Sequence, residues 1–364
     1  MSEVELLELL PEELEEQVTA WNLPRYRGRQ VAAWLWQKGV TAFTAMSDLP
    51  LEVRALLAAR AAVRLPGILA KHADPSGDAV KYLLGLADGH AVEAVLLRYR
   101  YGLTLCLSTQ VGCRMGCLFC ASAAAGWVRH LTAGEMAGQV LTVRRDAGEE
   151  IRRLVLMGIG EPLDNYEATR RFLLMATSPR GLAISPRRIT VSTCGLVPRI
   201  YDLAREGPRV TLAVSLHAPD DRLRDLLVPV NRRYPLRELI AACRAYAATT
   251  GRRVTFAYAL VAGVNDSPAQ ARRLAALIRG TLCQVNLIPL NRVEGKDFVP
   301  PTPGRVATFR RILEQEGVSV TVRRRLGTPV NAACGQLRRK WDVGKGRWAG
   351  AVECGNASGM PAAE

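Results

Sequence analysis

Three cysteines lie close together in one short segment of the chain. Cys113, Cys117 and Cys120 fall within the eight residues C-R-M-G-C-L-F-C. Thiolates bind zinc or iron–sulfur clusters, but both kinds of site normally use four protein ligands. Three thiolates at this spacing therefore favour a 4Fe–4S cluster with one iron left open for a small ligand. A structural zinc site, or thiols that bind no metal, is the alternative.

The other cysteines are spread along the chain, at Cys106, Cys194, Cys243, Cys283, Cys334 and Cys354. The total of nine is odd, and the acidic first residues, M-S-E-V-E-L-L-E, are unlike a secretory signal. We therefore expect no disulfide framework and a reducing, cytoplasmic location. No apolar run reaches the roughly 18 residues of a membrane span, so no membrane partner is expected.

The chain carries a large excess of positive charge. Among its 364 residues, 49 Lys and Arg face 34 Asp and Glu, which gives a formal net charge of +15. Such a surplus favours a polyanionic partner, RNA or DNA first, although it can also serve solubility alone. The arginines at 323–325 and the basic residues at 338–340 flank Cys334 and are the best candidates to bind phosphates.

Short apolar runs alternate with helical patterns over most of the chain, and these elements must position the residues above. Strands are expected at 103–108, 153–157, 188–192, 210–216, 254–260, 284–289 and 318–323, and helices near 131–146, 165–176, 197–206, 235–249, 267–279 and 304–316. Six or more βα units imply parallel strands with right-handed crossovers. A barrel and an open doubly wound sheet both fit, and in both the functional groups belong at the carboxyl ends of the strands.

Three further regions flank this α/β core, which we place at residues 101–342. Residues 1–65 have helical apolar spacing and predict a small helical accessory domain. Residues 66–100 contain two turn signals and an alternating run from Ala91 to Tyr99, which predicts a β-hairpin connector. Residues 343–364 are rich in Gly and Ala and predict a flexible tail.

Polar residues stand where several of the expected strands end. G-I-G-E-P, at 158–162, lacks the third glycine of a dinucleotide fingerprint, but its glycines would let the backbone approach a ligand. Its carboxylate, Glu161, can meet an ammonium group. Ser192, the triplet Ser215–Leu216–His217 and Asn291 also fall at strand ends, where polar groups line the mouth of a barrel or cap turns.

Six motifs together carry a resemblance to a known family. They are L-C-L-S-T-Q-V-G-C-R-M-G-C-L-F-C (105–120), M-G-I-G-E-P-L-D-N-Y (157–166), V-S-T-C-G (191–195), S-L-H-A-P (215–219), V-N-L-I-P-L-N (285–291) and N-A-A-C-G-Q-L (331–337). In these motifs, over roughly residues 20–341, the chain resembles the RlmN/Cfr family of radical S-adenosylmethionine (SAM) RNA adenine methyltransferases. The resemblance is closer to the RlmN branch. It implies an α/β fold, a partial (βα)6 radical-SAM barrel with a small N-terminal helical accessory domain.

The resemblance also implies the cofactors and their contacts. Cys113, Cys117 and Cys120 would hold one 4Fe–4S cluster, whose open iron binds SAM and whose electron cleaves it to a 5′-deoxyadenosyl radical. The residues that match the family's SAM contacts are Gly160, Glu161, Ser192, Ser215, Leu216, His217 and Asn291.

Two more cysteines and a carboxylate receive catalytic roles from the resemblance. Cys334 is the methyl carrier, because adenine carbon 2 is too poor a nucleophile for direct polar methyl transfer, whereas a thiolate accepts a methyl readily. Cys106 releases the protein–RNA adduct by forming a transient disulfide with Cys334. Glu93 matches a proton acceptor. Without the resemblance, Cys334 and Cys106 could be packing residues, and Glu93 could be an exposed strand residue.

The implied function is methylation of adenine carbon 2 in 23S rRNA and in tRNA near the anticodon, with two SAM consumed per methyl. Cfr-type methylation of carbon 8 is the alternative, and a non-catalytic RNA-binding factor with a structural cluster is a third. The implied partners are 23S rRNA, tRNA and a low-potential electron donor such as flavodoxin or ferredoxin, with the protein acting as a monomer. The chain departs from the family pattern at Ala257, His130 and Pro329–Val330.

Overall fold

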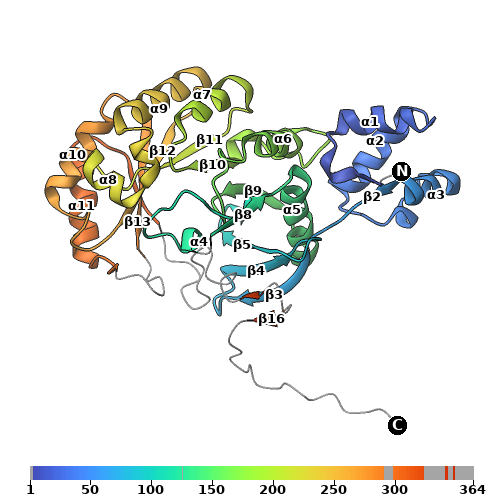
Figure 1. Cartoon of the computed structure of the whole chain (residues 1–364), viewed down its shortest axis with the longest axis horizontal. Coiled ribbons are helices and arrows are strands. Elements are labelled where there is room, and N and C mark those ends of the chain that lie inside the picture. Colours follow the sequence, from blue (N-terminus) through green and yellow to red (C-terminus); the bar gives the residue numbers. More distant parts are fainter. Residues whose placement is uncertain (1–2, 125, 291–297, 324–340, 343–346, 349–364) are drawn as a thin grey trace, which may run out of the picture.

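A ten-stranded mixed sheet forms the centre of the computed structural model, which describes residues 3–124, 126–290, 298–323, 341–342 and 347–348 (Figure 1). Its parallel part consists of β6 (Gly102–Cys106), β9 (Ile151–Leu156), β10 (Ile189–Thr193), β11 (Thr211–Ser215), β12 (Val254–Leu260), β13 (Cys283–Pro289) and β14 (Val320–Val322). All seven expected core strands are therefore present, in chain order across the sheet. Within the described residues the sheet does not close on itself, as expected of a partial barrel.

Six long helices connect these strands and cover one face of the sheet (Figure 1). They are α5 (Ala133–Ala147), α6 (Tyr166–Thr177), α7 (Val197–Glu206), α9 (Leu236–Thr250), α10 (Pro268–Ile278) and α11 (Pro303–Gln315). Local sequence sets their ends: Thr132 caps α5 by accepting the Glu135 N–H, and Gly148 ends it in a left-handed conformation. One short helix, α8 (Asp221–Leu227), was not expected, because seven residues are too few for a clear periodic signal.

The two faces of the parallel strands differ in chemistry because only one of them is covered by helices. Along β10, Ile189 and Val191 are buried against the helices, whereas Thr190 and Ser192 point to the other face and are partly exposed. Strands of a parallel sheet that is covered on both sides are apolar throughout. The uncovered side, called the inner face below, is therefore polar and accessible.

Residues 67–99 form three antiparallel strands rather than a two-stranded hairpin. These are β3 (Gly67–Ala73), β4 (Ala79–Gly85) and β5 (Ala91–Tyr99), and β5 pairs with β6 of the core. The segment thus extends the central sheet. The first seven residues of β5 are all buried, so the alternating pattern expected for this strand does not correspond to one exposed face.

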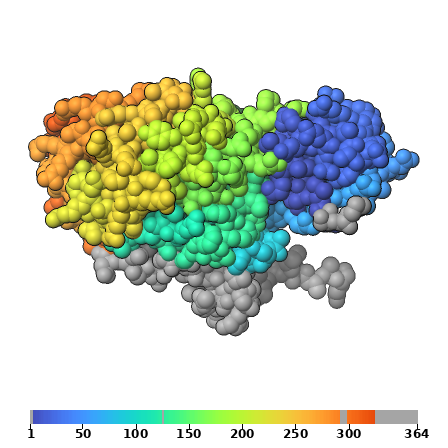
Figure 2. All heavy atoms as spheres, turned by 45° about the horizontal axis from the view of Figure 1, so that its top comes forward, coloured from blue at the N-terminus to red at the C-terminus, as the bar shows by residue number. Residues whose placement is uncertain are grey.

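The N-terminal region is helical, with α1 (Pro11–Ala20), α2 (Tyr26–Ala32), a π-helical turn (Ala33–Gln37) and α3 (Leu51–Arg60), and two short strands, β1 (Val4–Glu5) and β2 (Ala61–Ala62), pair beside them. It lies at one end of the molecule, beside α5 and α6 (Figures 1 and 2). Glu8 accepts the Gly134 N–H at 3.0 Å through its carboxylate, and its carbonyl accepts from Arg171 Nε at 2.7 Å. These bonds join the region to the core helices.

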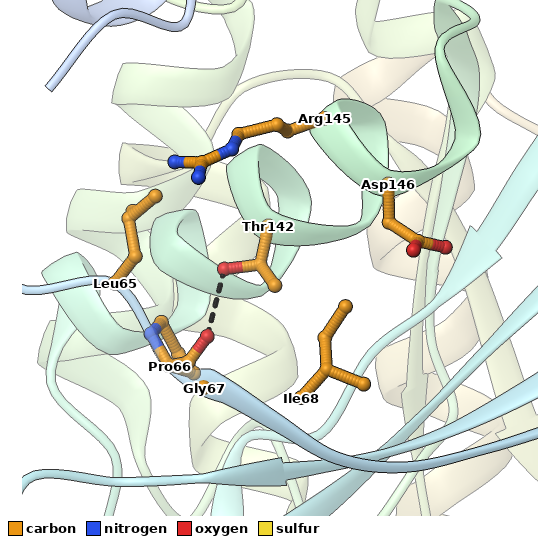
Figure 3. Close-up of a pocket in the computed structure, with 7 residues that line it drawn as sticks. All are labelled: Leu65, Pro66, Gly67, Ile68, Thr142, Arg145 and Asp146. Atoms are coloured by element: carbon orange, nitrogen blue, oxygen red, sulfur yellow. Dashed lines mark hydrogen bonds between the residues drawn. The ribbon is translucent and has the colours of Figure 1, made fainter. Parts of the chain in front are cut away.

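A cavity of about 380 Å³ lies where the chain leaves this region, between residues 65–68 and α5 (Figure 3). Thr142 Oγ1 donates a hydrogen bond to the Pro66 carbonyl at 3.0 Å across it. None of the predicted site residues lines this cavity. Elsewhere in the described part of the chain, no helix has the length and apolarity to cross a membrane.

Candidate active site

The three-cysteine loop lies between the two strands of a short hairpin. β7 (Gln110–Gly112) pairs with β8 (Trp127–His130), and the Cys113 N–H donates to the Gly126 carbonyl at 3.0 Å. Gly112 has φ +86°, and a Cβ there would lie 1.9 Å from the Gly126 oxygen, so only glycine fits. At its far side the loop is held to α8, because the Leu118 N–H donates to the Leu227 carbonyl at 3.0 Å. Both ends of the loop are thus anchored.

The three thiols are partly buried and close enough to influence one another. Burial raises the pKa of Cys113 to about 12, and Glu161 and Cys120 add to the shift. Burial likewise raises the pKa of Cys117, with Cys120 and Cys113 contributing. A bound metal centre supplies the positive charge that such thiols need to ionise.

The arrangement of the thiols suits a multi-iron cluster better than a single ion. Among the described residues, no three His, Cys, Asp or Glu side chains are gathered closely enough to hold one metal ion. In a 4Fe–4S cluster each cysteine binds a different iron, so the sulfurs need not converge on one point. The donor set of three thiols therefore fits a cluster with one iron free of protein.

Gly160 and Glu161 belong to the turn that follows β9. Gly160 has φ +111°, and a Cβ there would lie 2.7 Å from that of Gln110. Glu161 is buried, and its two carboxylate oxygens accept the N–H groups of Cys194 at 2.7 Å and Leu163 at 3.0 Å. Burial raises its pKa. Both residues thus have a role in forming the turn, in addition to any contact with a ligand.

Gln110 connects this turn to His130, one of the positions at which the sequence analysis expects a departure from the family pattern. Its Oε1 accepts the Glu161 N–H at 2.8 Å, and its Nε2 lies 3.0 Å from His130 Nδ1 and donates to Asp164 Oδ2 at 2.8 Å. Asp164 also forms an ion pair with Arg114 of the cysteine loop. His130 is therefore part of a hydrogen-bond network that supports the loop.

The predicted contacts at the end of β11 differ in what they can offer to a ligand. Ser215 is half-buried and is paired with Ala257 of β12. The Leu216 side chain is fully buried in the core beneath the helices, so that residue can present only its backbone to the inner face. Ser192, at the end of β10, is also half-buried and lies on the inner face.

His217 is held in one orientation. It has φ +59°, and its Nδ1 accepts the Ala259 N–H at 2.9 Å, which leaves the proton on Nε2. The Phe119 ring of the cysteine loop packs edge-on against the imidazole ring, with the two ring centroids 4.7 Å apart. Burial lowers the pKa of His217 to about 3, so the ring is neutral at physiological pH. It therefore positions groups and does not serve as a general acid.

Arg224, which the sequence did not single out, is completely buried beneath these strand ends. Its guanidinium donates to the carbonyls of Cys194 at 2.6 Å, Ser215 at 3.1 Å and Leu216 at 3.1 Å. Burial lowers its pKa. Four charged residues in D-R-L-R-D predict a solvated helix face, and no local signal identifies the one that points inward.

Cys106 and Glu93 lie on the inner face of neighbouring strands. Cys106 of β6 is paired with Val95 of β5, and Glu93 is two residues from Val95, so both side chains are on the same face. Glu93 is 2% exposed, which excludes the interpretation as an exposed strand residue. Its Oε2 lies 3.0 Å from Nζ of Lys81, itself 1% exposed. The sequence reasoning missed Lys81, although it precedes Glu93 in an equally apolar run.

Two of the predicted residues, Cys334 and Asn291, lie outside the described residues. The same is true of the basic positions 324–325 and 338–340, of Pro329–Val330 and of most of the predicted tail.

Comparisons with known proteins agree with this architecture. Residues 4–63 match the ribosomal RNA large subunit methyltransferase N-terminal domain, and residues 107–275 match the radical SAM superfamily. A probable dual-specificity RNA methyltransferase RlmN from Pelotomaculum thermopropionicum is 57% identical, over 90% of this chain and 89% of its own length. The chain belongs to the RlmN family of radical SAM RNA methyltransferases.

Other RlmN-family relatives support the same assignment. The probable RlmN of Desulforudis audaxviator is 56% identical over 85% of this chain and 98% of its own length. The crystal structure of a radical SAM methyltransferase from Sphaerobacter thermophilus superimposes with a TM-score of 0.88 at 48% identity, covering 92% of this chain and 98% of that one. Membership of the radical SAM superfamily implies a 4Fe–4S cluster and SAM, in agreement with the donor set of the cysteine loop.

Proposed function

We propose that this enzyme methylates carbon 2 of adenine in 23S rRNA and in tRNA near the anticodon, through an S-methylcysteine on Cys334. The observation that carries the proposal is the placement of Cys106 and Glu93 on the same face of two neighbouring strands, both buried. A thiol and a carboxylate in that position supply the two groups that adduct release requires.

In this proposal Cys113, Cys117 and Cys120 hold the cluster, and the cluster supplies the electron that cleaves SAM. Gly160, Glu161, Ser192, Ser215, Leu216, His217 and Asn291 contact SAM. Support comes from the hydrogen bonds that already order this edge: Glu161 fixes the Cys194 backbone, and His217 fixes that of Ala259. Leu216 would contribute its backbone.

The chain's own residues then transfer the methyl carbon to the RNA. The Cys334 thiolate attacks the methyl carbon of one SAM, and S-adenosylhomocysteine leaves. The radical from a second SAM would remove one hydrogen atom from that S-methyl group, so that its carbon could bond to adenine carbon 2, and one electron would return to the cluster. Glu93 accepts the proton that carbon 2 loses, and the Lys81 ammonium supplies the charge that a buried carboxylate needs. Cys106 attacks the Cys334 sulfur, so that a disulfide forms as the methylated base leaves.

Residues 1–65 would act as an accessory domain for structured RNA, residues 66–100 as a connector, residues 101–342 as the methyltransferase core and residues 343–364 as a tail. The protein would work as a cytoplasmic monomer with flavodoxin or ferredoxin as electron donor. The net charge of +15 supports an RNA partner.

Anaerobic reconstitution with iron, sulfide, SAM, a reductant and an RNA fragment tests the proposal directly. Mass spectrometry of the digested RNA should find 2-methyladenosine. Finding 8-methyladenosine instead would support Cfr-type chemistry. RNA binding without release of 5′-deoxyadenosine would support the non-catalytic alternative.

Two cysteine substitutions separate the proposed steps. Cys334→Ala should abolish methylation, because no thiol remains to carry the methyl group, while SAM cleavage persists. Cys106→Ala should trap protein covalently joined to RNA, because the adduct cannot be resolved. Denaturing electrophoresis with labelled RNA detects the adduct, and Cys283→Ala, on the start of β13, serves as the control. Free methylated RNA from Cys106→Ala would contradict the role given to Cys106.

A further inference from the structure

The inner face contains a groove that the steps above leave unused. It encloses about 580 Å³, within the range of pockets that bind nucleotide-sized ligands. Thr190, Thr211 and Thr255 form its floor, and each is the first or second residue of its strand. The groove therefore lies toward the amino ends of the parallel strands, whereas Ser192, Ser215 and His217 lie at the carboxyl ends.

Arginines dominate the lining of this groove, which we call the arginine groove: Arg100, Arg153, Arg187, Arg188 and Arg323. No Asp or Glu lines it. Within the described residues, none of the five takes part in an ion pair, although nearby Arg98 pairs with Glu149 at 2.6 Å. Converging guanidinium groups without carboxylates create a strong positive potential, which an anion relieves.

Aromatic rings accompany the guanidinium groups. Tyr99 and Tyr101 stack with centroids 4.9 Å apart and planes 14° apart. The Arg153 guanidinium lies over the Tyr101 ring at 4.6 Å, and Tyr101 is still 56% exposed. Exposed rings next to arginines are the surfaces on which unpaired RNA bases stack.

The dimensions favour a chain of phosphates over a single one. Five strand spacings separate β9 from β14, and neighbouring strands lie about 4.8 Å apart, so the groove follows roughly 24 Å of curved sheet. The sheet curves along that length, so that Arg323 after β14 and Tyr99 of β5 line the same groove, and several phosphates of one strand can bind along its concave surface.

The sequence that follows Arg323 offers these guanidinium groups no negative charge, because residues 324–340 include Arg324, Arg325, Arg338, Arg339 and Lys340 and no acidic residue. The anion that binds the groove must therefore come from elsewhere, and RNA is the polyanion on which the proposed function acts.

We propose that the arginine groove binds the RNA backbone beside the target adenine, with one base stacked on Tyr101. The inference rests on the proposed function and adds the place where the substrate is held. Leu97, Val155 and Met157 line the groove and also pack against Cys106. RNA bound there lies next to the thiol that must reach the adduct.

Equilibrium binding of transcribed tRNA, measured by fluorescence anisotropy at several KCl concentrations, tests the proposal. Arg187 and Arg188 are exposed in a 3-10 turn, so the double variant R187E/R188E should unfold at the parent's temperature. We expect at least tenfold weaker binding, and a slope of log K against log[KCl] that is lower by about 2. The matched control is R272E/R273E, an exposed pair on α10, which should bind within twofold of the parent.

The aromatic part has its own test. Tyr101→Ala should weaken tRNA binding about tenfold, and Tyr101→Phe should restore it, because stacking needs only the ring. If R187E/R188E binds tRNA as tightly as the parent protein, the proposal that the arginine groove binds RNA is wrong. If the variants lose binding as expected but the parent forms no 2-methyladenosine, the proposed methylation fails while the groove stands.

Discussion

At the scale of single residues, the inner face contains an ion pair that is buried almost completely. Lys81 and Glu93 lie 3.0 Å apart, at 1% and 2% exposure. Desolvating two charges costs several kcal/mol, which their mutual attraction offsets in part. Such a pair is a poor source of stability, which accords with the proton-accepting role proposed for Glu93.

A double-mutant cycle measures how strongly the pair is coupled. Lys81→Met should destabilise the protein by about 3–5 kcal/mol, because it removes the ammonium group beside the buried Glu93 carboxylate. Adding Glu93→Gln should recover much of that loss, as measured by urea unfolding. Truncating the exposed pair Arg98–Glu149 is the control and should leave the free energy of unfolding almost unchanged, because solvent screens an exposed ion pair. Additive effects of the Lys81 and Glu93 substitutions would show that the two are not coupled.

His217 should give stability a pH dependence. Its folded pKa is about 3, below the ordinary value of 6.5, so between these values the unfolded chain binds the proton more readily. Its stabilising contribution is complete above pH 6.5 and falls by roughly 1.4 kcal/mol per pH unit below it. Thermal unfolding of the cluster-free protein between pH 7 and 5, where most carboxylates stay ionised, measures the slope. His217→Gln should flatten it, and an unchanged slope would refute the assignment.

At the scale of elements, the β7–β8 hairpin and α8 decide where the cysteine loop lies. The loop itself has no regular structure, so its position depends on Gly112 at one end and on the bond from Leu118 to Leu227 at the other. Arg224 fixes the strand ends beneath it through three carbonyls. The site is thus built on rigid elements although the thiols lie on a loop.

Gly112→Ala tests this dependence. The added Cβ would overlap the Gly126 oxygen, so the hairpin must shift, at a cost of about 1–3 kcal/mol. We expect less iron per chain after reconstitution, measured by iron and sulfide analysis. Gly148→Ala is the matched control, because Gly148 also has positive φ (+65°) but nothing lies within 4 Å of its Cβ position. Equal iron contents in the two variants would argue against the role of the hairpin.

At the scale of the whole molecule, polar bonds and shared apolar packing attach the N-terminal region to the core. Arg171 of α6 donates to the Glu8 carbonyl and forms an ion pair with Glu13 of α1, and the Glu8 carboxylate accepts from α5. Arg171 therefore joins two parts of the N-terminal region to one core helix.

Arg171→Ala should loosen the N-terminal region without unfolding the core. Limited proteolysis should then cleave faster near residues 60–68, where the chain passes from α3 to β3. Arg170→Ala is the control, because Arg170 pairs only weakly with Glu167 of its own helix, at 3.7 Å. Identical digestion of both variants would show that other contacts hold the region in place.

The sequence alone determined the features that depend on local spacing. The alternation of apolar runs with 3.6-residue periodicity predicted all seven core strands and six helices, and three cysteines in eight residues predicted the cluster loop. The order of the motifs identified the family. Each of these signals is contained within a few neighbouring residues, so no long-range contact is needed to recognise it.

Only the tertiary structure decided which charged residues face inward. Lys81, Arg224 and four of the five groove arginines look like ordinary surface charges in the sequence, because burial and partners depend on which strands pair and which face the helices cover. Among the groove arginines, Arg323 alone was expected from the sequence to bind phosphate. Strand pairing brings Lys81 to Glu93, and the uncovered inner face gathers arginines from positions 100 to 323. These are consequences of packing between distant segments, which no local pattern records.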